Sequence, residues 1–518
     1  MAASETGPGK MRLIASASSI GTVIELYDFV IFASVAALVF PKIFFPALGS
    51  AAGTVASFAT LGVAFVARPV GSILFGHFGD RLGRKRTLVS TLLLMGIATV
   101  LVGAMPTADQ IGVAAPLLVV AMRILQGIAV GGEWTGATLM AAEYAPKPRR
   151  GFWSMFASLG GAIGSALALA TLLVTRMTMS DAAFLSYGWR IPFLASVLLL
   201  LVGLYIRGSI EETPVFKEEI ARRGAASAPL LEAIKHQPRE VLFGSGVLLT
   251  VFAFIYMVLG YMISYGTAEL GLSETTVLAI TILASVVIAP AIVLGGALSD
   301  RIGRRTVIIG GNAVAVFWAL ALFPVLGSAS AATFAVGACV TMIIAGVTYG
   351  PVGAFMPELF HTRYRYSATG FSYNIAGVLG GAVPGVVAAA TIDTYGPLAF
   401  GAFLAVLCLI GLGCTVALGE TKDAEMGSGD GYGHRSHRRH RRSSRTRMPC
   451  PRTACARTRR ARARTTPFAI DGHDPAGTLE AICPPRSTFR PTQSCSHALT
   501  PRQDRPGVSS APTTSSAP

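Results

Sequence analysis

Twelve apolar runs, each close to the length of one membrane crossing, constrain the fold of this chain more than any other feature. A helix needs about 20 residues to cross about 30 Å of hydrocarbon. Only 14% of the 518 residues are charged, against roughly a quarter in soluble proteins. The sequence therefore predicts an all-α polytopic membrane protein with twelve transmembrane helices, and not a soluble enzyme. The runs lie at residues 14–40, 53–75, 88–105, 113–137, 153–175, 191–207, 241–265, 276–298, 307–326, 331–356, 368–392 and 397–418.

The basic residues between the runs predict the orientation of the chain. When the connections are assigned to alternate sides of the membrane, twenty Lys and Arg residues fall on one side, and only Lys42, Arg176 and Arg190 fall on the other. Cytoplasmic connections carry such an excess of positive charge. We therefore expect a multi-pass protein of a bacterial plasma (inner) membrane with both termini in the cytoplasm.

The longest connection divides the runs into six and six. This division predicts a cytoplasmic N-terminus at 1–13, an N-terminal six-helix half at 14–207, a charged, partly helical cytoplasmic linker at 208–240, a C-terminal half at 241–420 and a tail at 421–518. The tail carries 18 Lys and Arg against 7 Asp and Glu, and its lack of apolar periodicity predicts a disordered basic cytoplasmic segment. It is either an accessory that binds anionic lipid or an out-of-frame extension without function.

One charged motif occurs twice, each time directly after an apolar run. The stretch GHFGDRLGRKR begins after the second run, and GALSDRIGRRT begins after the eighth. These positions are equivalent in the two halves, which predicts two six-helix halves repeated in parallel. Glycine permits a tight turn, and an aspartate at a helix end caps an N-terminus or pairs with arginine. We predict a gating role for Gly76, Asp80, Arg81, Gly83, Arg84, Asp300, Arg301, Gly303 and Arg304, and for Glu358 and Arg363 after the tenth run.

Five ionisable residues lie inside the first, second and fourth runs. Such residues cost about 2.5–3.5 kcal/mol each on insertion scales and are candidates for function. Glu25 and Asp28 share one helix face, and their spacing from the run ends places both near the membrane midplane with Arg123. Arg68 and Glu133 fall at a common level nearer the cytoplasm. We therefore expect Arg123 to pair with Asp28 or Glu25, and Arg68 to pair with Glu133.

These charges suit proton coupling. Two carboxylates on one face cannot both ionise cheaply, so either Glu25 or Asp28 is able to bind and release a proton. Arginine keeps its charge, so protonation of the acid would free Arg123 for a substrate carboxylate. The alternative is that these residues form a static set of buried ion pairs that fixes helix packing. This alternative is stronger for Arg68 and Glu133 than for Glu25, Asp28 and Arg123.

Tyrosine and asparagine side chains within the runs are candidates for contacts with a substrate in a central cleft. They serve equally well as interhelical hydrogen-bond partners or as anchors at the membrane interface. No cysteine or histidine spacing predicts a metal site and no nucleotide-binding motif occurs, so we expect no cofactor. The candidates are Tyr27, Tyr256, Tyr261, Tyr349, Tyr373 and Asn374.

Both loop motifs and the stretch RILQGIAVGGEWTGA resemble the major facilitator superfamily. The chain is most similar to its metabolite:proton symporter branch, in particular to shikimate-transporter-like members and a related group of inner-membrane metabolite transporters. The resemblance covers about residues 12–422, and it implies the major facilitator fold and a link between Arg123 and proton coupling. The stretches that carry it also include IELYDFVIF from Ile24, YGWRIPF from Tyr187, EETPVF from Glu211 and MPELFHTRYRYSATGFSYNIAG from Met356.

We therefore expect a secondary active transporter that takes up a small polar metabolite with protons. The expected substrate is an organic acid of the shikimate, dicarboxylate or citrate type. Proton-coupled uptake of proline or betaine is the alternative, and a membrane sensor that does not transport is a further one. The expected partners are the substrate, protons and the lipid bilayer, with no nucleic acid, and the protein is expected to be a monomer.

Overall fold

Long helices make up most of the chain that the computed structural model describes, residues 7–223 and 226–426. No strand occurs in those two ranges. Eleven helices of this part are long and apolar enough to cross a membrane. An interrupted helix over Arg365–Tyr395 takes the place of the eleventh predicted run and completes twelve crossings. The predicted all-α, twelve-helix fold is therefore confirmed.

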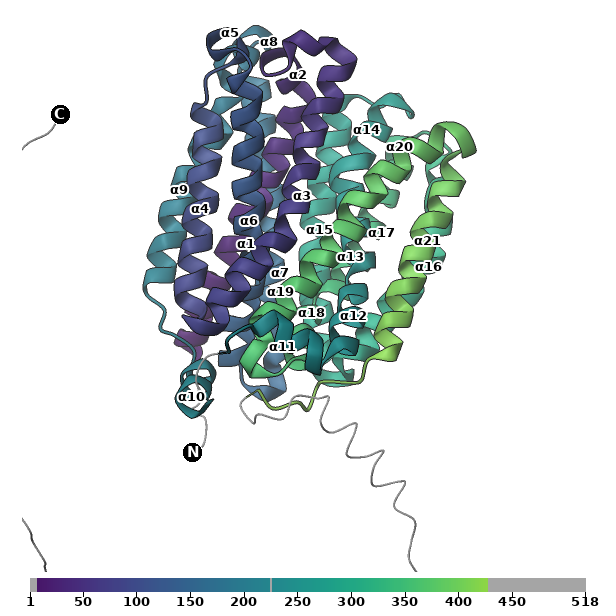
Figure 1. Ribbon diagram of the computed structural model, residues 1–518. Helices are drawn as coiled ribbons and strands as arrows, with labels where there is room; N and C mark the ends of the chain where they lie inside the picture. Colours follow the sequence, from purple (N-terminus) through teal and green to yellow (C-terminus); the bar gives the residue numbers. More distant parts are fainter. Residues whose placement is uncertain (1–6, 224–225, 427–518) are drawn as a thin grey trace, which may run out of the picture. The chain divides into compact units, whose positions relative to one another are not determined.

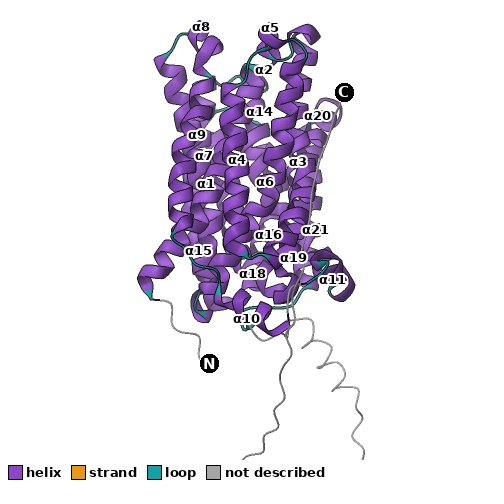
Figure 2. Ribbon diagram, turned by 60° about the vertical axis from the view of Figure 1, so that its left-hand side comes forward, coloured by secondary structure: helices purple, strands orange, loops and turns teal. Residues whose placement is uncertain are grey.

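Six of the crossings precede the linker. Their long apolar stretches contain few helix breakers, and Pro69 is accommodated inside α3. Helices α2, α5 and α8 form short turns that lie together at one end of the bundle (Figures 1 and 2). The elements are α1 (Pro8–Leu38), α2 (Phe40–Ile43), η1 (Pro46–Leu48), α3 (Gly49–Arg81), α4 (Arg84–Ala104), α5 (Ala108–Ile111), α6 (Ala114–Tyr144), η2 (Lys147–Arg149), α7 (Arg150–Thr178), α8 (Asp181–Ala183), η3 (Phe184–Gly188) and α9 (Arg190–Gly208).

Six crossings follow the linker, and the seventh and eleventh each contain a π-helical turn, η4 and η6. Such turns widen a helix locally and are frequent at functional sites. The elements are α12 (Pro238–Val247), α13 (Leu249–Tyr256), η4 (Met257–Tyr261), α14 (Met262–Ala268), α15 (Glu274–Ile302), α16 (Arg304–Leu326), α17 (Ala331–Tyr349), α18 (Val352–Leu359), η5 (Thr362–Tyr364), α19 (Arg365–Gly377), η6 (Val378–Ala382), α20 (Val383–Tyr395) and α21 (Pro397–Ala417).

The linker contains two helices, α10 (Pro214–Arg223) and α11 (Pro229–His236). Both lie at the end of the bundle opposite to α2, α5 and α8 (Figures 1 and 2), and we call this the linker end. Helix α1 begins there, because Lys10 pairs with Glu211 at 3.5 Å. The purple-to-blue helices before the linker meet the teal-to-green helices after it along α3 with α19 and along α7 with α15 (Figure 1).

Several boundaries differ from the sequence prediction; α6, for example, ends at Tyr144 instead of at residue 137. Helix α1 begins at Pro8, before the predicted start at residue 14. The described chain also continues past the predicted start of the tail, because Thr421 donates a 2.6 Å hydrogen bond to Glu358 and the Met426 carbonyl accepts from Arg365. Residues 421–426 are ordered by these buried charged groups. The rest of the predicted tail, residues 427–518, lies outside the described residues. The division of the chain into an N-terminal half, a linker, a C-terminal half and a tail as separate domains stays a prediction.

Candidate functional site

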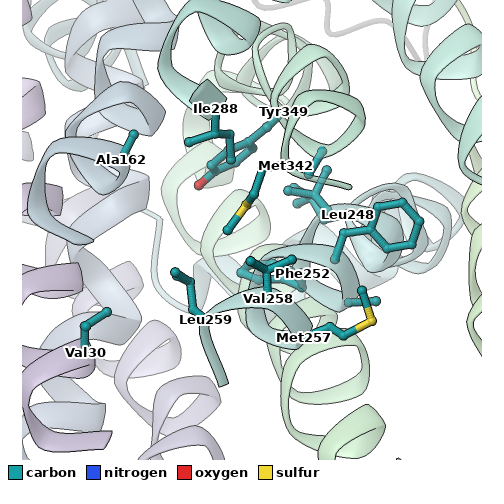
Figure 3. Close-up of a cluster of buried hydrophobic side chains, with 14 of the residues drawn as sticks. Val30, Ala162, Leu248, Phe252, Met257, Val258, Leu259, Ile288, Met342 and Tyr349 are labelled. Carbon is teal, nitrogen blue, oxygen red and sulfur yellow. The ribbon is translucent and has the colours of Figure 1, made fainter. Parts of the chain in front are cut away.

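Side chains from both halves line one cavity. The N-terminal half contributes α1 and α7, and the C-terminal half contributes the seventh crossing with α15, α17 and α19. Ala162 of α7 and Leu259, Ile288 and Tyr349 of the C-terminal half all line this cavity, and Figure 3 shows these four side chains. The cavity has a volume of about 40 Å³, room for a few water molecules. A metabolite therefore needs the helices to separate before it fits.

The cavity wall is apolar with several hydroxyl groups and no charged side chain. The hydroxyls of Tyr349 and Tyr373 lie 3.1 Å apart, and the Tyr256 hydroxyl accepts a 2.9 Å hydrogen bond from Arg68. The Thr22 and Ser285 hydroxyls are buried without a hydrogen-bond partner among the described residues. Buried polar groups are normally paired, so these hydroxyls keep hydrogen-bonding capacity for a ligand.

Three of the six predicted cleft residues line the cavity, namely Tyr256, Tyr349 and Tyr373. The other three do not, and the prediction is corrected for them. Tyr27 donates to the Pro192 carbonyl at 3.1 Å, Asn374 donates to the Gly131 carbonyl at 2.9 Å, and the Tyr261 ring packs on Phe400. Each helical residue is turned about 100° from the one before it, so Tyr27 does not share the direction of Glu25.

Asp28 and Arg123 form a buried pair in which both carboxylate oxygens of Asp28 accept hydrogen bonds. Their closest atoms, Arg123 Nη1 and Asp28 Oδ2, are 3.2 Å apart. Asp28 Oδ1 also accepts from Gln126 at 2.8 Å and from Thr99 at 2.9 Å. The guanidinium of Arg123 lies 3.6 Å from the centre of the Phe32 ring. The predicted pairing is present, and these donors offset part of the cost of burying the Asp28 carboxylate.

Glu25 and Arg68 form a looser pair, which the sequence analysis did not predict. Arg68 Nη2 lies 4.0 Å from Glu25 Oε1, and Glu25 Oε2 is buried without a hydrogen-bond partner. Arg68 donates its stronger bond to Tyr256, and its guanidinium lies 4.4 Å from the centre of the Phe65 ring. Of the two acids on α1, Glu25 therefore has much the weaker set of partners.

The predicted pairing of Arg68 with Glu133 is wrong. Glu133 pairs with Arg207 and accepts a 2.7 Å hydrogen bond from Thr91. Arg207 is in the last turn of α9 and is one of the twenty basic residues assigned to the cytoplasmic side, and its exposed fraction is only 2%. Spacing along a helix estimated the depth of Glu133 but not its direction, and the side chain faces α4 and α9 rather than α3.

The two motif aspartates each bind the first turn of a helix in the opposite half. Asp80 accepts from the backbone N–H groups of Tyr366 at 3.1 Å and Ser367 at 2.9 Å, in the first turn of α19. Its carboxylate also lies 3.3 Å from Arg84. An acid that accepts such N–H groups is stabilised by the positive end of the helix dipole.

Asp300 makes the equivalent contact with α7. It accepts from the backbone N–H groups of Gly151 at 2.8 Å and Phe152 at 2.9 Å, and it pairs with Arg304 at 3.1 Å. Both motif turns require the left-handed backbone region, because φ is 109° at Gly83 and 105° at Gly303. The two motifs thus connect the halves at the linker end.

Two glutamates each form an ion pair with an arginine of the opposite half. Glu143 of the N-terminal half lies 3.5 Å from Arg365 of the C-terminal half, and Glu358 lies 2.8 Å from Arg150. Glu143 also pairs with Arg84 and Glu358 with Arg304. The sequence analysis did not single out Glu143, Arg150 and Arg365, which form these ion pairs between the halves. A signal was present, since glutamate and arginine recur seven residues apart at 143/150 and 358/365.

The remaining predicted gate residues are Arg81, Arg301, Arg363 and Gly76. Arg81 and Arg301 are exposed. Arg363 pairs with Glu232 of α11 at 2.7 Å, and this hydrogen bond raises the pKa of the Arg363 guanidinium. Gly76 lies against α19, where an added Cβ would be 2.8 Å from Ser367 Cα. No group of three or more metal-ligating side chains occurs in the part of the chain that the structure describes.

The fold agrees with the comparisons. The model of the Major Facilitator Superfamily matches residues 20–384. The inner membrane metabolite transport protein YhjE of Escherichia coli is 39% identical over 415 residues, covering 79% of this chain and 94% of the relative. The shikimate transporter of Escherichia coli is 37% identical, with 74% and 89% covered.

Two further comparisons bear on fold and substrate. The proline/betaine transporter of Escherichia coli is 32% identical, covering 81% of this chain and 85% of that protein. The structure of the proton:xylose symporter XylE has a TM-score of 0.67 at 19% identity, covering 82% of this chain and 99% of that one. The chain belongs to the major facilitator superfamily. It is a multi-pass membrane protein and a secondary transporter, not an enzyme.

The segment at 421–426 gives a first prediction. We expect a chain that ends at Asp430 to transport like the full-length protein. A chain that ends at Glu420 loses acceptors for Arg150 and Arg365, whose guanidiniums bond to the carbonyls of Ala424 and Met426. Buried donors left unpaired cost about 1–3 kcal/mol each. The melting temperature in detergent and uptake in cells measure the difference, and equal behaviour of the two truncations would contradict it.

Proposed function

We propose that the protein imports a small hydroxylated organic acid together with protons, with Glu25 as the proton carrier. The observation that carries this proposal is the unequal bonding of the two acids on α1. Asp28 accepts from three side chains, whereas Glu25 has one partner at 4.0 Å and one oxygen without any. A carboxylate with few donors in a buried place binds a proton more readily than a saturated one.

Arg68 is the proposed link between the proton and the substrate. Protonation of Glu25 removes the negative charge that faces Arg68, while the arginine keeps its own charge. Arg68 bonds to Tyr256, whose ring lines the cavity. Only the Tyr256 side chain therefore separates the Arg68 guanidinium from a ligand in the cavity. The substrate carboxylate then replaces Glu25 as the negative charge that faces Arg68. Because this replacement needs a protonated Glu25, substrate binding is coupled to proton binding. Arg123, held by Asp28 and Gln126, keeps a positioning role in this scheme.

The cavity wall supports a hydroxylated acid with one carboxylate over a di- or tricarboxylate. A second carboxylate would find no cation in the wall, and a buried unpaired charge is expensive. Hydroxyl groups of the ligand would instead meet Thr22, Ser285 and the tyrosines. This class contains the shikimate-like acids named in the sequence analysis and disfavours citrate.

The proposed direction is uptake, with the linker end in the cytoplasm as the basic residues predict. The contacts of Asp80, Asp300, Glu143 and Glu358 then close the cytoplasmic side of the cavity. Substrate and proton enter from the opposite side, and the gate contacts break when the halves rock. Alternating access of this kind is the general behaviour of two-half transporters.

Purified protein in liposomes tests the proposal. We expect a pH gradient, acidic outside, to drive accumulation of a shikimate-like hydroxy acid, and we expect citrate to compete poorly. Counterflow without a gradient reports binding and rocking independently of proton coupling. Counterflow of the acid without any pH-driven accumulation would contradict proton coupling, and transport of citrate alone would contradict the substrate class.

Betaine uptake is a second candidate with an observation in its favour. The rings of Phe252, Tyr256, Tyr349 and Tyr373 line the cavity, and aromatic faces attract quaternary ammonium groups. The proline/betaine relative adds support. The two candidates separate in one assay, since glycine betaine displaces a labelled substrate in counterflow only if the second is correct.

Tyr256→Phe gives a prediction for the substrate site. We expect the substrate concentration for half-maximal counterflow to rise by about tenfold, because a hydrogen bond to a charged group contributes about 1.5–3 kcal/mol. Tyr261→Phe is the matched control, since Tyr261 does not line the cavity. Equal effects of the two substitutions would show that Tyr256 does not hold Arg68 for the substrate.

A further inference from the structure

Three acid–guanidinium pairs follow one face of α1. Residues 21, 25 and 28 recur at i, i+4 and i+7, so they lie in one row. Asp28 pairs with Arg123, and Glu25 faces Arg68. Gly21 has no side chain, and the Glu133–Arg207 pair occupies the space that a side chain at this position would need. An added Cβ at Gly21 would collide with Glu133 Oε1 and Arg207 Nη2.

The third pair is on the linker-end side of the other two. Helix α1 begins at the linker end, so Gly21 lies about 6 Å closer to it than Glu25 along the axis. Side chains on a helix lean toward its N-terminus, which directs the Glu25 carboxylate toward Gly21 and hence toward Glu133.

Two helices bring hydrogen-bond donors to Glu133, and α1 packs against it. Thr91 of α4 donates to Oε2 at 2.7 Å, Arg207 of α9 donates to both oxygens, and Gly21 of α1 leaves the space that this pair occupies. Tyr366 of α19 donates to the neighbouring Gly132 carbonyl at 2.6 Å. The place is therefore a second buried carboxylate beside the proton carrier, on the side that leads to the gate.

We propose that Glu133 receives the proton from Glu25 and passes it toward the linker end, with Arg207 as a positioning residue. This inference rests on the proposed function. In the step, the O–H bond of the Glu25 carboxyl breaks and an O–H bond forms on the Glu133 carboxylate. Glu25 returns to its charged form opposite Arg68, which releases the substrate carboxylate. Glu133 then loses the proton to water, and its pair with Arg207 is restored. No electron is transferred.

A purely structural ion pair is the competing explanation, and a double substitution separates the two. Removing one partner of a buried pair leaves an uncompensated charge, whereas removing both is often nearly neutral for stability. We therefore compare wild type with Glu133→Gln/Arg207→Gln in liposomes, using the labelled hydroxy acid. We expect counterflow within about twofold of wild type and a loss of pH-driven accumulation of about tenfold or more, as for removal of a proton-transfer group.

Two results would overturn the inference: full pH-driven accumulation in the double variant, or equal loss of counterflow and accumulation, which marks a structural pair. Glu133→Asp provides a second measurement, because it keeps a carboxylate but shortens its reach to Arg207 and Thr91. We expect it to retain accumulation with a shifted dependence on internal pH, and an unchanged profile counts against the relay. Absence of pH-driven accumulation in wild type is a different result, which contradicts the proposed function itself.

Discussion

Glu25→Gln is expected to abolish pH-driven accumulation while counterflow continues. The amide resembles the protonated acid and cannot release a proton, so substrate still binds and crosses but no proton is exchanged per cycle. Arg68 stays available for the substrate carboxylate because the charge that faced it is gone. The expected loss is complete within the sensitivity of the assay. Counterflow and pH-driven uptake are measured on the same liposome preparation.

Asp28→Asn is the informative companion variant and should fail in a different way. It leaves Arg123 buried without its carboxylate, and breaking one partner of a buried pair costs about 3–5 kcal/mol. We expect less inserted protein, a lower melting temperature, and parallel loss of counterflow and uptake. If Asp28→Asn is the variant that keeps counterflow and loses accumulation, the proton carrier is Asp28. If both variants keep pH-driven accumulation, the acids on α1 are structural.

Asp80→Asn is expected to open the linker end. Asp80 binds two backbone N–H groups and the hydroxyl of Ser367 in the opposite half, and it pairs with Arg84. Loss of its charge removes a buried ionic contact worth about 3–5 kcal/mol, which shifts the ratio of closed to open molecules by about 100-fold or more. Asp300→Asn should be milder, because Asp300 has fewer donors from the opposite half and a more exposed side chain.

Reactivity of a single thiol measures this opening. Ser154 of α7 is fully buried, and its backbone packs on Gly353 of α18. In a background without other reactive cysteines, Ser154→Cys should react slowly with a water-soluble maleimide and much faster when combined with Asp80→Asn. Asp181→Asn, an exposed charge pair at the opposite end, is the matched control. Unchanged reactivity in the Asp80 variant means that the motif does not hold the gate.

The sequence by itself determined the crossings and the repeat. An apolar stretch of about 20 residues has one low-energy arrangement in a bilayer, because backbone groups must be hydrogen-bonded within the segment. Most ends of the predicted runs therefore fall within four residues of the observed helix ends, and the largest difference, seven residues, is at the end of α6. The two copies of the charged motif identified the parallel halves, and Asp80 and Asp300 do occupy helix-capping positions. The position of Glu25, Asp28 and Arg123 inside apolar runs also identified them as candidates, because charged residues in membrane segments are costly and usually functional.

Only the tertiary structure decided which groups meet. Spacing along a helix gives the depth of a side chain, but the direction depends on how each helix is rotated and packed. For that reason Glu133 pairs with Arg207 instead of Arg68, and Tyr27 does not line the cavity. The contacts between the halves could not be predicted from the sequence either, since Asp80 and Tyr366 are 286 residues apart. Such contacts form between halves that are linked by a long connection, and their geometry follows from helix packing rather than from any local pattern.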